Sequence, residues 1–272
     1  GGFSTISNLG DSKDIQATRS CLSALKTGQP AGEDGLPLLD CGESGSTLRF
    51  LIPLSLVLRG GGHFTGRGRL MERPLTPYEA LFQEKGISWS LENGVLTIDS
   101  GRGYDRLALD PGEYRLPGNV SSQFITGLLF VLPLLDGDSN LVLTSPLESR
   151  GYVDLTLDVL RTFGIRVEER ADAFHVPGNQ RYESRNFTVE ADWSQAAFWY
   201  AANFAGGQVD IQGQGSLFLC CLLLGGGMGL VYDGMRLARR ILPHGVWAVQ
   251  IEDGLYWAAV ALGVFEVLLK EN

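Results

Sequence analysis

The chain has 272 residues, of which 44% are hydrophobic and 19% charged, so it can bury one large core or two modest ones. Its formal net charge of −9 argues against a nucleic-acid partner and against an anionic membrane surface. A small anionic ligand is not excluded, because such a ligand senses only the few arginines close to it.

The cysteines and histidines show no pattern of a metal site. The four cysteines have neither metal-ligand spacing nor a disulfide framework, and there are only three histidines. Reduced cysteines are typical of a cytosolic setting. The first residues, "GGFSTISNLGDSKD", lack the apolar core of a signal peptide. We therefore expect a cytoplasmic protein without a metal.

Three stretches begin with small polar residues and continue as an apolar helix, glycines and a strand. They cover residues 44–66, 121–145 and, for the start of a third, 193–213. In the first, Gly45 and Ser46 precede Arg49, which is typical either of a simple helix cap or of amides and a cation around an anion. Pro53 and Pro133 are expected inside two of these helices, where each should kink the axis.

Residues 76–98 align without a gap with residues 154–176, and Gly86 then falls on Gly164. Each copy predicts an amphipathic helix closed by glycine, followed by two strands and a tight turn. In the first copy we expect Thr76 to cap the helix and Asn93-Gly94 to form the hairpin turn.

Units of helix, strand, helix and hairpin that repeat so few times indicate a closed, pseudo-symmetric α+β domain instead of a solenoid. The loop before the second helix of each unit carries "RLMERPL" or "PLESRGYVD". We expect these loops to meet the Ser-rich helix starts at one end of the domain. Several helix N-termini with Ser, Gln and Arg around them favour an anionic ligand.

Five motifs in order resemble the 5-enolpyruvylshikimate-3-phosphate synthase family: "ESGSTLRF", "MERPL", "VSSQFITGLL", "LESRGYVDLTLDVLRTFGI" and "VEADWSQAAFWYAA". The resemblance covers about residues 6–215. It implies an inverse αβ barrel domain with pseudo-threefold repeats, and a monomer. It also implies transfer of the enolpyruvyl group of phosphoenolpyruvate to the 5-hydroxyl of shikimate 3-phosphate, with release of phosphate and without a metal or organic cofactor.

The resemblance assigns six residues to shikimate 3-phosphate: Ser121, Ser122, Gln123, Ser149, Arg150 and Tyr152. It assigns three to phosphoenolpyruvate, with one secondary candidate: Gly45, Arg73 and Gln123, then Arg49. Asp192 and Ser194 match a motif where the chain crosses between domains, and we interpret them as structural. Without the resemblance, a helix cap would be the favoured interpretation of Ser121–Gln123, and a snorkelling or ion-paired side chain that of Arg49.

From residue 216 the sequence no longer follows the family, and the N-terminal Pro-Gly-Ser-Lys type segment also has no counterpart. We expect residues 1–215 to form a substrate-binding domain, and residues 216–272 to be an incomplete or frameshifted second domain that does not enter a membrane. The missing motifs carry the acid–base residues of the family, so the chain should hold no catalytic residue and activity should be impaired.

Three alternatives remain. The first is an inactive shikimate 3-phosphate-binding domain. The second is a protein similar to UDP-N-acetylglucosamine enolpyruvyl transferase, although its Cys-bearing loop has no counterpart here. The third is an interaction module whose Ser and Arg residues only cap helices.

Overall fold

The computed structural model describes residues 3–28, 34–102, 108–189 and 256. The chain divides into two units, residues 1–188 and 189–272, and the architecture below is that of the first. Several predictions lie outside the described residues: those for residues 193–213 and 216–272, and for Asp192, Ser194, Cys220, Cys221 and His244.

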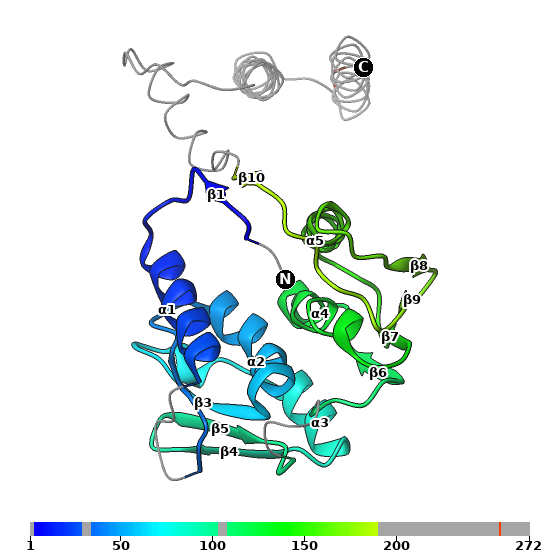
Figure 1. Ribbon diagram of the computed structural model, residues 1–272. Coiled ribbons are helices and arrows are strands. Elements are labelled where there is room, and N and C mark those ends of the chain that lie inside the picture. Colours follow the sequence, from blue (N-terminus) through cyan, green and yellow to red (C-terminus); the bar gives the residue numbers. More distant parts are fainter. Residues whose placement is uncertain (1–2, 29–33, 103–107, 190–255, 257–272) are drawn as a thin grey trace, which may run out of the picture. The chain divides into compact units, whose positions relative to one another are not determined.

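Two four-stranded sheets with the same topology form the frame of the first unit (Figure 1). The first sheet has the order β2 (Leu38–Asp40), β3 (Gly61–Thr65), β5 (Val95–Asp99), β4 (Ser88–Glu92). The second has the order β6 (Glu113–Leu116), β7 (Ser139–Leu143), β9 (Ala173–Val176), β8 (Glu168–Arg170). In both sheets the first pair is parallel and the other two pairs are antiparallel.

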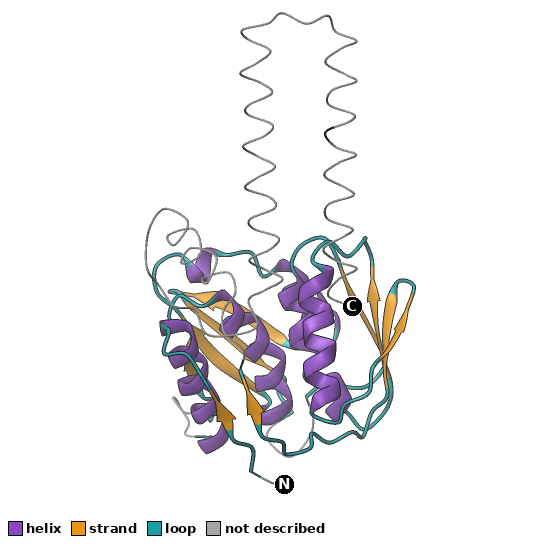
Figure 2. Ribbon diagram, turned by 90° about the horizontal axis from the view of Figure 1, so that it is seen from above, coloured by secondary structure: helices purple, strands orange, loops and turns teal. Residues whose placement is uncertain are grey.

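Five α-helices and two 3₁₀ turns connect these strands. They are α1 (Lys13–Thr27), α2 (Gly45–Arg59), η1 (Leu70–Glu72), α3 (Thr76–Glu84), α4 (Ser122–Leu129), η2 (Leu132–Leu134) and α5 (Arg150–Thr162). Helices α2 and α4 pack against each other, and α4 also packs against α5, so helices meet between the sheets (Figure 2). A short parallel pair, β1 (Ile6–Ser7) with β10 (Phe187–Thr188), joins the two ends of the unit.

The predicted repeat is confirmed. Helix α3 with β4 and β5 corresponds to α5 with β8 and β9. Gly86 and Gly164 close the two helices with φ of 75° and 82°, in the left-handed region that glycine adopts without strain. Asn93 and Gly94 also have positive φ, as the predicted two-residue turn requires.

Two local predictions are wrong. Leu75, not Thr76, is the cap residue of α3, because the helix begins one residue earlier and places Thr76 in its first turn. Pro53 does lie inside α2, but Pro133 does not lie inside α4, which ends at Leu129. Pro133 occupies η2, since a proline cannot donate a backbone bond and its ring opposes a continuing α-helix.

Within the first unit, buried aromatic residues join the two sheets and their helices. The hydroxyl of Tyr78 on α3 donates to the carbonyl of Phe124 on α4 at 2.8 Å, and their rings meet edge to face at 4.8 Å. Gly127 of α4 faces the carbonyl oxygen of Arg49 on α2, where an added β-carbon would lie only 2.7 Å away. Glycine at this position therefore lets α2 and α4 approach closely, which sets the position of the site residues on both helices.

Candidate functional site

A cavity of about 600 Å³ lies among α2, α4 and α5. Five of the predicted site residues line it: Ser121, Ser122, Gln123, Ser149 and Tyr152. They come from the N-terminal ends of α4 and α5, two helices that pack against each other. The structure therefore brings together these five residues, which the sequence places in two motifs about 25 residues apart.

The rest of the cavity wall, apart from Ser46, was not predicted from the sequence. The additional lining residues are Ser46 and Phe50 on α2, Thr126 and Phe130 on and just after α4, and Leu155, Thr156 and Val159 on α5. On α4 and α5 these residues follow the predicted ones at spacings of three, four and seven, which places them on the same helix faces, so this period was the available signal there. The hydroxyls of Thr126 and Thr156, 2.9 Å apart, join α4 to α5.

The three serines at the helix starts differ in what their hydroxyls do. Ser121 caps α4, and its hydroxyl accepts from the Gln123 N–H at 3.3 Å. Ser149 is the cap residue of α5 but makes no capping bond. Within the described part of the chain, the side-chain hydroxyls of Ser122 and Ser149 form no hydrogen bond. These two hydroxyls, beside the amide end of α4, can bind an anion or a hydroxyl group.

Two arginines flank Gly45 at the start of α2. A β-carbon added at Gly45 would lie 2.6 Å from Arg73 Nη1 and 3.1 Å from Arg49 Nη1. Among the described residues neither guanidinium forms an ion pair. Burial, followed by the neighbouring Arg73 cation, lowers the pKa of Arg49 below its usual value. Two cations beside a helix N-terminus, without a carboxylate, favour an anionic ligand at Gly45.

Gln123 connects the two groups of residues. It lines the cavity, and its Oε1 accepts a 2.8 Å bond from Arg49 Nη1. Arg73 itself does not line the cavity but lies beside Gly45 and Arg49. The five cavity-lining residues predicted for shikimate 3-phosphate and the predicted phosphoenolpyruvate residues therefore lie in adjoining positions, and Gln123 contacts both groups.

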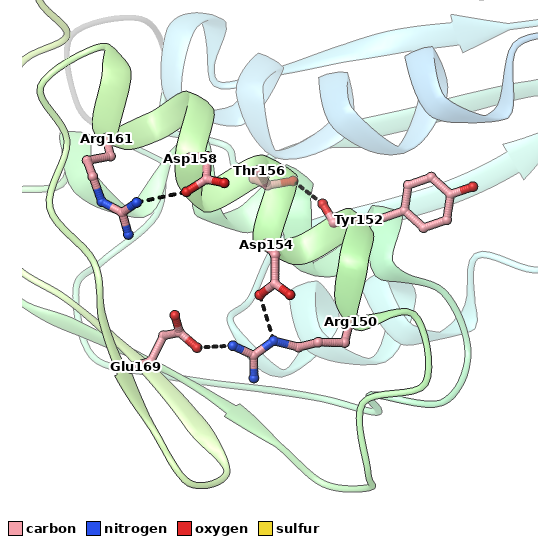
Figure 3. Close-up of polar contacts among 7 residues, drawn as sticks. All are labelled: Arg150, Tyr152, Asp154, Thr156, Asp158, Arg161 and Glu169. Atoms are coloured by element: carbon pink, nitrogen blue, oxygen red, sulfur yellow. Dashed lines mark hydrogen bonds and ion pairs between the residues drawn. The ribbon is translucent and has the colours of Figure 1, made fainter. Parts of the chain in front are cut away.

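Arg150 does not line the cavity, and its side chain turns toward Asp154 and Glu169 (Figure 3). Its Nε donates to Asp154 Oδ1 at 2.6 Å, and another guanidinium nitrogen contacts Glu169 of β8. The bond with Asp154, followed by the charge of Glu169, raises the pKa of Arg150. The ring of Tyr152 points to the other side of α5. The geometry does not bring Arg150 to the cavity, so its contact with a phosphate stays a prediction.

Two kinds of feature are absent from the described residues. They contain no group of three His, Cys, Asp or Glu side chains placed to hold a metal ion. No helix in the described part of the chain combines the length and apolar character needed to cross a membrane.

Comparison with known proteins separates the chain into two parts. Residues 1–217 match the family described as EPSP synthase (3-phosphoshikimate 1-carboxyvinyltransferase). Residues 218–272 match the family described as spore cortex protein YabQ.

Curated relatives of the chain are named 3-phosphoshikimate 1-carboxyvinyltransferase. The protein of Clostridium beijerinckii is 42% identical over 223 residues, which are 74% of this chain and 50% of the relative. That of Clostridium acetobutylicum is 43% identical over 227 residues, covering 76% of this chain and 51% of the relative. The chain thus spans about half the length of the curated relatives it matches.

A solved EPSP synthase from Acinetobacter baumannii superposes with a TM-score of 0.57 at 20% sequence identity, over 73% of this chain and 46% of that one. This likeness confirms the predicted fold class, a partial inverse αβ barrel of mixed helices and sheets. The family match covers 217 of the 272 residues. The chain belongs to the EPSP synthase family.

Proposed function

We propose that the whole enzyme transfers the enolpyruvyl group of phosphoenolpyruvate to the 5-hydroxyl of shikimate 3-phosphate, and that residues 1–215 supply the half that binds shikimate 3-phosphate. The observation that carries this proposal is the convergence of Ser121, Ser122, Gln123, Ser149 and Tyr152 on one cavity. The names of the relatives support the reaction type.

The contacts divide between two ligands. The N-terminus of α4 with the Ser122 and Ser149 hydroxyls suits the phosphate of shikimate 3-phosphate, because amides and hydroxyls donate to phosphate oxygens. The Arg73 guanidinium beside Gly45 suits the carboxylate or phosphate of phosphoenolpyruvate, whose oxygens match its paired donors. Gln123 lies where it can reach both.

The reaction adds the 5-hydroxyl oxygen to C2 of phosphoenolpyruvate, while the hydroxyl loses its proton and C3 gains one. Phosphate then leaves C2 while C3 loses a proton, which restores the enol double bond in the product. We assign none of the described residues to these proton transfers. Catalysis requires the reacting groups to be arranged around both substrates at once. We therefore propose that this chain alone binds shikimate 3-phosphate and turns over little, as a cytoplasmic monomer.

Calorimetric titration of the 272-residue chain with shikimate 3-phosphate tests the proposal. We expect measurable heat at millimolar ligand, and no heat with UDP-N-acetylglucosamine. Absence of heat and of a thermal shift with either ligand would favour an interaction module in which the serines only cap helices. Phosphate release with both substrates then separates an impaired enzyme from an inactive binding domain.

Gly45→Ala should weaken phosphoenolpyruvate binding without destabilising the fold. The new methyl group would meet the guanidinium ends of Arg73 and Arg49 at 2.6 and 3.1 Å, and these flexible ends can move away. Gly45 lies in the first turn of α2 at a φ that alanine adopts, so the unfolding midpoint should stay the same or rise slightly.

We expect Gly45→Ala to raise the dissociation constant for phosphoenolpyruvate about tenfold, which is the effect of losing one well-placed charged hydrogen bond. An NMR titration in the presence of shikimate 3-phosphate measures it. An unchanged constant would show that the ligand does not approach Gly45.

A further inference from the structure

Arg49 lies behind Gln123, outside the wall of the cavity. Its Nη1 donates to Gln123 Oε1 at 2.8 Å, its Nη2 donates to the Pro74 carbonyl at 3.4 Å, and its Cζ lies 5.1 Å from the centre of the Phe124 ring. Its Nε is buried and has no hydrogen-bond partner among the described residues. These three contacts together hold the guanidinium against Gln123, Pro74 and Phe124.

This contact determines which end of the Gln123 amide faces the cavity. A guanidinium has only donors, so the amide oxygen must be the atom that turns toward Arg49. The amide NH₂ is then the end left for a ligand, because Gln123 also lines the cavity. Without Arg49, the amide could turn over and present its oxygen, which would repel the oxygens of a phosphate or a carboxylate.

We infer that Arg49 is a positioning residue that fixes the Gln123 amide with its two N–H donors toward shikimate 3-phosphate. This inference rests on the proposed function, which supplies the ligand. Arg49 does not line the cavity, so it acts on this ligand through Gln123. Its bond to the Pro74 carbonyl also holds the loop that carries Arg73, which links the positions of the two proposed subsites.

The substitution Gln123→Glu should have a specific effect on ligand binding. A carboxylate would keep the bond from Arg49, and one of its oxygens would face the cavity in place of the NH₂ group. A negative oxygen repels a dianionic phosphate, whereas a truncated side chain only loses a donor. Gln123→Glu should therefore weaken shikimate 3-phosphate binding more than Gln123→Ala does.

A double-mutant cycle in the full chain, read by calorimetry with shikimate 3-phosphate, tests the role of Arg49. Arg49→Met should weaken binding about tenfold in the wild-type background and less than about twofold in the Gln123→Ala background, because the two residues act as one unit. Arg49→Lys should retain part of the affinity, since the ammonium can still donate to Oε1. Arg161→Met is the matched control, as Arg161 pairs with Asp158 on the outer face of α5 (Figure 3), and should leave affinity unchanged.

A ligand-free measurement separates this inference from the proposed function. The side-chain NH₂ resonances of Gln123 in a ¹⁵N correlation spectrum should move in Arg49→Met and stay in place in Arg161→Met. If the wild-type chain binds no shikimate 3-phosphate, the proposed function fails, and this spectrum alone decides the orientation of the amide.

Either of two results would overturn the inference: an equal loss of affinity from Arg49→Met in both backgrounds, or Gln123 resonances that do not respond to Arg49→Met. Should Arg49→Met fail to fold in a thermal unfolding experiment, the comparison of Gln123→Glu with Gln123→Ala decides, and tighter binding by Gln123→Glu would contradict it.

Discussion

Arg73→Ala is expected to weaken phosphoenolpyruvate binding about 10- to 100-fold, the loss that removal of a charge-assisted bidentate contact produces. The guanidinium lies beside Gly45 at the N-terminus of α2, and among the described residues it has no carboxylate partner that would neutralise it. Its removal should change stability little, because the side chain is exposed. Titration in the presence of shikimate 3-phosphate, followed by NMR, measures the loss.

The neighbouring residue provides the matched control. Glu72 pairs with Arg69 at 2.9 Å and does not contact Arg73 through any hydrogen bond or ion pair that the structure describes. Both members of the Glu72–Arg69 pair are exposed, so the pair contributes little. Glu72→Ala should leave ligand affinity nearly unchanged. Equal losses from Glu72→Ala and Arg73→Ala would contradict the assignment of Arg73 to an anion.

Gly127→Ala is expected to lower the free energy of unfolding by about 2 kcal/mol, as insertion of a methyl group into a packed contact does. The β-carbon would lie 2.3 Å from the Tyr78 hydroxyl oxygen and 2.7 Å from the Arg49 carbonyl oxygen. The second contact is with backbone, so α2 and α4 must separate. Thermal unfolding measures the effect, with an expected decrease in Tm of about 4–8 °C.

Gly151→Ala is the control for this substitution. Gly151 lies in α5, and a β-carbon added there would meet nothing within 4 Å. Alanine favours the helix over glycine, so the free energy of unfolding should stay the same or rise by up to about 1 kcal/mol. The Tm should accordingly stay the same or rise. A Gly127→Ala variant as stable as Gly151→Ala would show that the two helices do not pack as closely as described.

The repeat could be predicted from the sequence because its signals are local. Gly86 and Gly164 end their helices through their own backbone freedom, and Asn93-Gly94 forms its turn for the same reason. The first residue of α3 and the position of Pro133 outside α4 could not be predicted from local signals. Leu75 caps a helix without a side-chain bond, and α4 ends at Leu129, four positions before the proline.

The candidate site could be predicted where a motif holds its own residues together. Ser121, Ser122 and Gln123 share one helix start, and Ser149 and Tyr152 share the next. The direction of Arg150 depends on Glu169, which lies 19 residues away on β8. The bond between Arg49 and Gln123 joins residues 74 positions apart. Contacts of this kind depend on the packing of helices, which no local pattern contains.

For the segment after residue 215, an incomplete or frameshifted second domain stays a prediction. The match of residues 218–272 to a spore cortex protein family offers another origin, a junction between two unrelated coding sequences. Sequencing of the source locus distinguishes the two. Family motifs in another reading frame downstream indicate a frameshift, and their absence indicates a junction.

Chemical-shift mapping of the full chain with shikimate 3-phosphate tests most directly whether two helix starts share one phosphate ligand. The expected result is that the amide signals of Ser121, Ser122, Gln123 and Ser149 move together along one binding curve, while those of the β8–β9 hairpin stay in place. Signals that do not move at millimolar ligand, or that move with different binding constants at the two helix starts, would contradict it.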